Sequence, residues 1–156
     1  MSTIEGHHEP GYIYGNPKTH KNLVDPPLRP IISQVGTVTY TTAKKLNSII
    51  TPYMQKRYMI DSTSEFIQIA RTVRNPKMIA SLDVESLFTN APLLQTIDII
   101  IESIYHHPTL KAPRIPPGIL KDLLILCTTK TPFKTPDNLL YQQIEGVGMG
   151  TPLGPR

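Results

Sequence analysis

The acid in the stretch SLDVESLFTNAP is the first residue whose position could support chemistry. Asp83 follows a short apolar run and precedes the aromatic Phe88 by five residues. A carboxylate at the end of a strand lies where loops usually build sites, and Mg²⁺ binds one or two carboxylates together with substrate phosphates. The same side chain could instead cap the following turn. Taken alone, the stretch is compatible with a metal ligand and with an ordinary turn.

Three glycines could bring the backbone close to a ligand. Gly146, Gly148 and Gly150, in EGVGMGTPLGP, permit conformations and close approaches that a side chain would block. Such a segment can offer amides to a phosphate or lie beneath a base. It has neither the Gly-Lys-Ser/Thr of a Walker A loop nor the spacing of a dinucleotide fingerprint. A Gly/Pro-rich loop without a ligand also fits the pattern.

A third group is basic. Lys18, Lys21 and Arg29 lie in PKTHKNLVDPPLRPI, where they could clamp a triphosphate or a nucleic-acid backbone. Residues 1–77 hold ten Lys and Arg against five Asp and Glu, net +5, whereas residues 78–156 hold six against seven, net −1. This asymmetry would suit a polyanion held over a carboxylate-bearing site. A solvated basic loop and ordinary charge scatter explain the same numbers.

The elements that must position these residues follow from periodicity. The chain has 156 residues and 39% hydrophobic content, enough for one core. Ser62, with Glu65 three residues later, predicts a helix N-cap, followed by an apolar stripe of Phe66, Ile69, Ala70 and Val73. The irregular alternation of elements predicts an α+β (mixed α/β) fold. We expect short extended pieces in 11–21 and 27–40, helices at 41–57, 62–74, 93–106 and 117–129, a short buried strand at 77–84, and a hairpin at 132–146 around a Pro-Asp-Asn turn.

Composition also bears on location. Cys127 is the single cysteine, so it cannot form an intrachain disulfide, and we expect a buried structural thiol. Residues 1–10 lack the apolar core of a signal peptide and are expected to be a disordered tail. No apolar run approaches the length that spans a membrane. We therefore expect an intracellular protein, nuclear or cytoplasmic, without a membrane partner.

Taken in order, four segments resemble the motifs of reverse transcriptases, most closely those of Penelope-like retroelements. YGNPKTHK is similar to the first fingers motif, and PLRPIISQVGTVTYTTAKKL to the second, with its Arg-Pro-Ile core. SLDVESLFTNAP is similar to palm motif A, and LLYQQIEGVGMGTPLGP to motif B. The resemblance covers about Tyr14 to Pro155. It implies a polymerase-type domain over 11–156, with fingers at 11–77 and a partial palm with motifs A and B at 78–156.

The resemblance implies a role for each matching residue. Asp83 matches the metal-binding aspartate of motif A, and the carbonyl of Val84 is the adjacent backbone ligand. Phe88 matches an aromatic steric gate against the ribose 2′-hydroxyl. The remaining matches concern the nucleotide: Lys18 and Arg29 are expected to hold the triphosphate, and Gly150 lies in motif B near the nascent base pair, after Met149, where many relatives have Gln. Gly154 stands where the family commonly has Ser.

The resemblance also implies the chemistry of the parent enzyme. That chemistry is RNA-directed DNA synthesis with two Mg²⁺ ions, deoxynucleotide triphosphates, an RNA template and a DNA primer. A metal pair at the α-phosphate requires at least two carboxylates close together. The second belongs to motif C, an aromatic-x-Asp-Asp hairpin that this sequence lacks, as it lacks the thumb. We expect both to lie beyond Arg156 and the chain alone to be inactive or nearly so.

Two alternatives stay open from the sequence. The chain could be a non-catalytic nucleic-acid-binding remnant, in which the basic half grips RNA without chemistry. It could also fold poorly, because half a palm leaves sheet edges and apolar faces uncovered.

Overall fold

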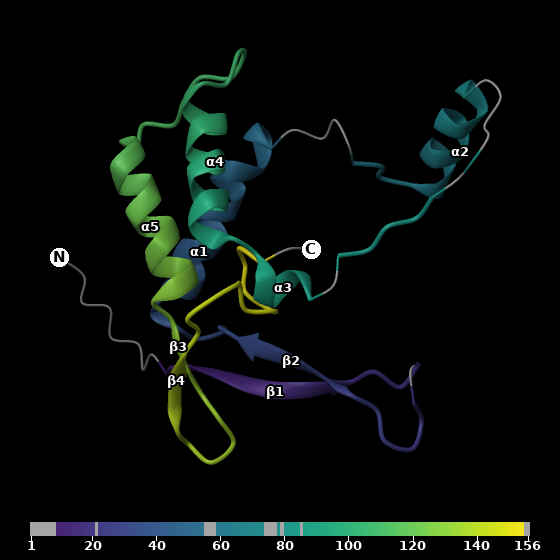
Figure 1. Ribbon diagram of the computed structural model, residues 1–156. Helices are drawn as coiled ribbons and strands as arrows, with labels where there is room; N and C mark the ends of the chain where they lie inside the picture. Colours follow the sequence, from purple (N-terminus) through teal and green to yellow (C-terminus); the bar gives the residue numbers. More distant parts are fainter. Residues whose placement is uncertain are drawn as a thin grey trace.

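A computed structural model describes residues 9–20, 22–54, 59–73, 78, 80–84 and 86–154 of the chain. Figure 1 shows helices gathered on one side of a small sheet. The elements in chain order are β1 (Gly11–Pro17), β2 (Leu28–Ser33), α1 (Val38–Ile50), the 3-10 turn η1 (Thr51–Tyr53), α2 (Thr63–Thr72), α3 (Leu87–Asn90), α4 (Leu93–Tyr105), α5 (Pro117–Thr129), β3 (Pro132–Lys134) and β4 (Leu140–Gln142). The α+β class is confirmed. Most of the predicted tail, residues 1–8, lies outside the described residues.

The sheet joins the two ends of the chain. Its order is β2-β1-β3-β4, in which β1 pairs antiparallel with β2 and parallel with β3. The hairpin β3–β4 turns where predicted: Asn138 adopts a left-handed conformation, and the Thr135 amide donates to the Leu139 carbonyl at 3.0 Å. Segments from residues 11–77 and from 78–156 therefore share one sheet.

Three helices build the core. The spacing of Ala43, Leu46 and Ile50 gives α1 an apolar stripe, and all three side chains are buried. They pack with buried residues of η1, α4 and α5, namely Tyr53, Ile97, Ile104, Leu120, Leu124 and Cys127. Burying one Leu or Ile side chain contributes about 1.5–3 kcal/mol, so this cluster is the main apolar contribution to stability. Cys127 is a buried thiol, as predicted, and burial raises its pKa.

Two tyrosines fasten the loop between α4 and α5 to this core. The Tyr53 hydroxyl donates to the Lys111 carbonyl at 2.8 Å, and the Tyr105 hydroxyl donates to the Ile115 carbonyl. Burial, with a smaller contribution from Tyr53, raises the pKa of Tyr105. A long Pro-containing connection is thereby held by hydrogen bonds to its backbone rather than by regular structure.

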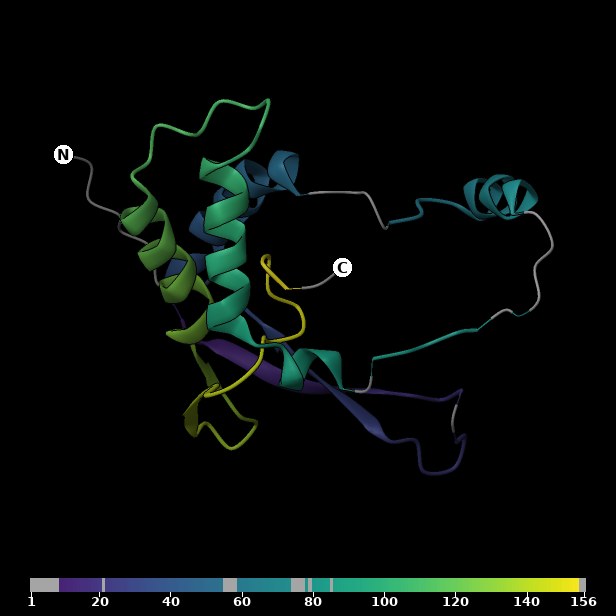
Figure 2. The ribbon, with the colours of Figure 1, turned by 45° about the horizontal axis from the view of Figure 1, so that its top comes forward.

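Helix α2 forms as predicted, but its apolar stripe is not buried. Ser62 caps it by accepting the Glu65 amide at 3.2 Å, and the Glu65 carboxylate accepts the Asp61 amide at 2.8 Å. However, α2 stands apart from the other helices (Figures 1 and 2), and the expected apolar stripe is exposed at Phe66, Ile69, Ala70 and Val73. Local sequence was sufficient for the helix and its cap, but not for a packing partner.

The predicted buried strand at 77–84 is wrong for the residues that can be checked. Lys77 and Ile79 lie outside the described residues, and Met78 and 80–84 are in no strand. Met78 is 84% exposed and Leu82 96% exposed. An apolar run becomes a strand only when a neighbour pairs with its backbone, and no described strand lies in register with this one.

The lengths and hydropathy of the helices also bear on membranes. Within the described ranges, no helix is both long and apolar enough to cross a bilayer.

Candidate functional site

Six of the seven sequence-predicted site residues line one open pocket of about 740 Å³. The pocket lies between the β1–β2 hairpin, the segment before α3, and the Gly-rich loop. Its described lining is Lys18, His20, Arg29, Asp83, Val84, Ser86, Leu87, Phe88 and Met149. Residues that are more than a hundred positions apart in the sequence are thus brought together. Gly150 is the predicted residue that lies outside this pocket.

The cationic side of the pocket is built on the end of the β1–β2 hairpin. Strand register places Arg29 opposite Asn16, and just beyond β1 the Lys18 amide donates to the Pro27 carbonyl at 2.9 Å. Pairing of the backbones therefore fixes where both basic side chains leave the hairpin. His20, which the sequence reasoning did not select, lines the same pocket. Lys21 lies outside the described residues.

The acidic side is held by local contacts. Asp83 is exposed, and one carboxylate oxygen accepts the amide of Val84 at 2.9 Å. The first turn of α3 is closed by a different residue, because the Ser86 carbonyl accepts the amides of Thr89 and Asn90. The Asp83 carboxylate thus accepts its neighbour's amide, does not cap α3, and lines the pocket.

Helix α3 is a single turn that presents Phe88 to the pocket. It begins after Ser86, which has φ 52° and lies in the left-handed region. That conformation costs a non-glycine residue about 1–3 kcal/mol, and such strain clusters at functional sites. Ser86 itself lines the pocket, as do Asp83 before it and Phe88 after it.

The Gly-rich loop docks against α3 through a position where only glycine fits. A Cβ on Gly146 would lie 2.2 Å from the Phe88 carbonyl oxygen and 2.8 Å from the Thr89 Cα, and the residue has φ 71°. The next amide, of Val147, donates to the same Phe88 carbonyl at 2.7 Å. Close backbone contact, rather than side-chain packing, thus fixes the loop on α3.

The same loop then reaches strand β2. The Ile32 amide donates to the Met149 carbonyl at 2.8 Å. Gly150 has φ 93°, and a Cβ there would lie 3.0 Å from the Ile32 carbonyl oxygen. The loop therefore bridges the edge of the sheet and α3. Met149 faces the pocket with Asp83, and Gly150 faces a second cleft.

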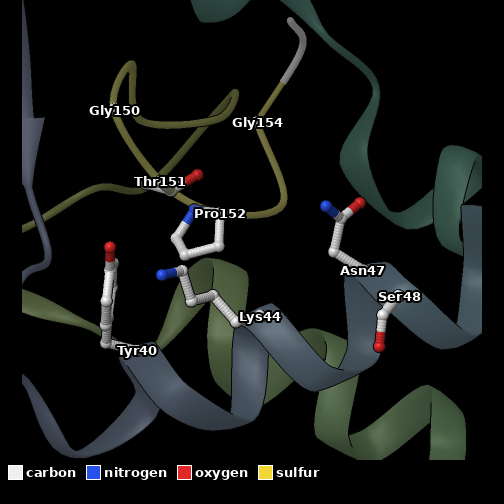
Figure 3. A pocket seen from close by; sticks show the side chains of 8 residues that line it. All are labelled: Tyr40, Lys44, Asn47, Ser48, Gly150, Thr151, Pro152 and Gly154. Atoms are coloured by element: carbon white, nitrogen blue, oxygen red, sulfur yellow. The ribbon is translucent and has the colours of Figure 1, made fainter.

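The second cleft, shown in Figure 3, has a volume of about 550 Å³ and lies between α1 and the loop at 150–154. Lys44 lies on the exposed face of α1, and its side chain points toward the loop. The sequence signal for this cleft was the polar face of α1, whose residues recur at helical spacing. This face contributes Tyr40, Lys44, Asn47 and Ser48, with the Lys44 ammonium 5.0 Å from the Tyr40 ring centroid.

The pocket's fit to a metal can be judged from its donors. Among the described residues, Asp83 is the one acid in the lining, and no three His, Cys, Asp or Glu gather closely enough to hold an ion. One carboxylate and a backbone carbonyl, completed by ligand phosphates, can hold one Mg²⁺. A pair of ions needs a further carboxylate. Glu85, near Asp83 in sequence, lies outside the described residues.

Comparisons of this chain with protein-family models, with curated proteins and with solved structures gave no match. Any assignment of function therefore depends on the sequence motifs and on the geometry of the pocket.

Substituting Gly146 tests whether the loop holds the site together. We expect Gly146→Ala to destabilise the protein by more than about 1–2 kcal/mol, because alanine disfavours a positive φ and its Cβ meets backbone atoms. Urea denaturation measures the loss, and faster hydrogen exchange of the Val147 amide locates it. Gly118→Ala is the matched control: a Cβ there meets open space in α5, so stability should be kept or raised by up to about 1 kcal/mol. Equal effects of the two substitutions would contradict the docking role.

Proposed function

We propose that the chain is the fingers-like and partial palm portion of a reverse transcriptase and that the pocket binds a deoxynucleotide triphosphate. Its partners in the complete enzyme would be an RNA template, a DNA primer and Mg²⁺. The observation that carries this proposal is the meeting of six motif-derived residues in one pocket. The four motifs are separated in sequence, and a chance likeness would give no reason for their selected residues to converge.

The charges of the pocket support an anionic ligand. Lys18 and Arg29 stand opposite a single described acid, Asp83, so the lining has an excess of positive charge. A triphosphate supplies the missing negative charge, and the planar guanidinium of Arg29 suits bidentate contact with phosphate oxygens. Asp83 and the Val84 carbonyl would share one Mg²⁺ with those oxygens, and the ion would neutralise phosphate charge.

Phe88 would select the sugar. Its ring lines the pocket beside Asp83, and the α3 backbone that carries it is fixed by Gly146 and Val147. A ring held in this way resists displacement, so an added 2′-hydroxyl would meet a rigid obstacle. Discrimination between deoxyribose and ribose would then come from steric exclusion of the 2′-hydroxyl rather than from a hydrogen bond.

Nucleotide binding is the first test. In Mg²⁺, the chain should bind dATP, and Arg29→Ala should weaken binding about tenfold or more, because a charge-assisted contact to phosphate is lost. Isothermal titration calorimetry measures both affinities. Lys45→Ala removes an exposed cation of α1 that does not line the pocket, and should leave binding unchanged. Binding that is insensitive to Arg29, or equally sensitive to Lys45, would contradict the assignment of this pocket.

Sugar selection is tested at Phe88. The unmodified chain should bind dATP more tightly than ATP. Phe88→Ala should reduce the ratio of the two affinities, because the smaller side chain admits the 2′-hydroxyl. Phe88→Leu keeps an apolar contact with the loop while shortening the side chain, and should give an intermediate ratio. Competition titrations measure the ratios, and circular dichroism confirms folding. An unchanged ratio in both folded variants would exclude a gate at this residue.

Primer extension tests the extent of the chemistry. With Mg²⁺, deoxynucleotides and a primed RNA template, residues 1–156 should incorporate little or no nucleotide, because Asp83 is the one acid in the described lining and a metal pair needs two. Robust incorporation that is abolished by Asp83→Ala would overturn this expectation. No incorporation, with salt-dependent binding of an RNA–DNA hybrid but no binding of dATP, would favour the non-catalytic nucleic-acid-binding alternative.

A further inference from the structure

The helices leave one face of the β1–β2 hairpin uncovered. In Figures 1 and 2, α1, α3, α4 and α5 all lie on the same side of these strands. Ile13 and Ile32, which pair across the strands, line a cleft with Phe88 and Val147 and so mark the covered face. Because successive strand residues alternate between faces, Tyr12 and Tyr14 lie on the opposite face. They are 54% and 46% exposed.

The two exposed rings form one surface. Their centroids are 5.7 Å apart, and their planes are inclined by 31°. The strand register places a cation near each end of this surface. Lys134 of β3 pairs with Tyr12 at one end, and Arg29 of β2 pairs with Asn16, two residues beyond Tyr14, at the other. We call Tyr12, Tyr14 and Lys134 the outer strip; Arg29 lies at its end, where it also lines the covered cleft with Ile13, Ile32 and Phe88.

We propose that the outer strip binds single-stranded nucleic acid, with bases stacked on Tyr12 and Tyr14 and phosphates near Lys134 and Arg29. Aromatic rings accept any base because every base has a π face, and flanking cations attract the backbone. The five β1 residues from Tyr12 to Asn16 are separated by four rises and span about 13 Å, a length suited to two or three extended nucleotides. A protein partner would not require a cation at each end of an aromatic pair.

The outer strip also leads to the candidate nucleotide pocket. Arg29 ends the strip and lines the pocket that contains Asp83. A strand on the outer face would therefore reach the pocket around the hairpin end without crossing the helical core. The proposal concerns binding alone, and it holds whether or not the pocket supports chemistry.

Binding of labelled single strands tests the outer strip. Fluorescence anisotropy with oligo-deoxythymidine and oligouridine, without Mg²⁺ or nucleotide, should show salt-sensitive binding to the unmodified chain. Tyr12→Ala and Tyr14→Ala should each weaken it by at least about fivefold, while Tyr12→Phe and Tyr14→Phe should retain it because they keep the ring. Comparing the two oligonucleotides shows whether the strip distinguishes RNA from DNA.

The control is an equally exposed tyrosine on the other face. Tyr141 is 50% exposed and pairs with Phe133, so it lies opposite in alternation to Lys134 and Tyr12. Tyr141→Ala should bind like the unmodified chain. Equal losses at Tyr141 and Tyr12, no loss in the Tyr12 and Tyr14 alanine variants, or no binding at all would overturn the proposal. A change of oligomeric state in these variants by sedimentation, with strand binding intact, would identify the face as a self-contact instead.

Discussion

The backbone docking of the Gly-rich loop is the constraint on which the candidate site depends. One short segment, 146–150, donates a hydrogen bond from Val147 to the Phe88 carbonyl and accepts one from Ile32 through Met149. The first contact sets α3, and with it the Phe88 ring. The second ties the loop to the sheet whose far end carries Lys18 and Arg29. Side chains at Gly146 or Gly150 would separate these backbones, so the distance between the aromatic and basic sides of the pocket is set by missing Cβ atoms.

Electrostatics then decides what this geometry can hold. Two cations, Lys18 and Arg29, and a histidine share the pocket with one described carboxylate. An exposed ion pair at a protein surface adds little to stability. An anion with several oxygens, however, can contact both cations at once. The same reasoning extends over the hairpin end to the outer strip, because Arg29 lies at the end of the strip and also lines the pocket.

Local patterns in the sequence predicted those elements whose formation depends on residues nearby in the chain. Helices at 93–106 and 117–129 match α4 and α5 closely, because apolar spacing and a helix-starting proline define them. The Ser62 cap and the 132–146 hairpin were likewise predictable. The strand at 77–84 failed because strand formation needs a partner, and periodicity cannot show whether one is there. The cleft beside Lys44 was not predictable for a related reason: only the position of the loop at 150–154 makes the polar face of α1 one wall of a cleft. The convergence of the site residues was predictable through the family resemblance, and composition and spacing alone left each motif with an ordinary explanation.

The two sides of the pocket are held unequally, and this affects how a ligand could bind. Lys18 and Arg29 project from a paired hairpin, and Phe88 projects from a turn fixed by the loop. The Asp83 carboxylate, by contrast, accepts a hydrogen bond from its own neighbour Val84, in a segment outside the sheet. In the proposed function, a nucleotide would meet cationic and aromatic residues whose backbone is already held in place, which lowers the cost of ordering that side. Holding Asp83 against the phosphates would cost free energy, because its segment must be ordered. Contacts with the ligand, or a strand that pairs with residues 80–84, would have to offset that cost. In the proposed polymerase, that pairing would also be the natural place for a second carboxylate, because neighbouring strands lie about 5 Å apart. Completing the sheet and completing the metal site would then be one structural event.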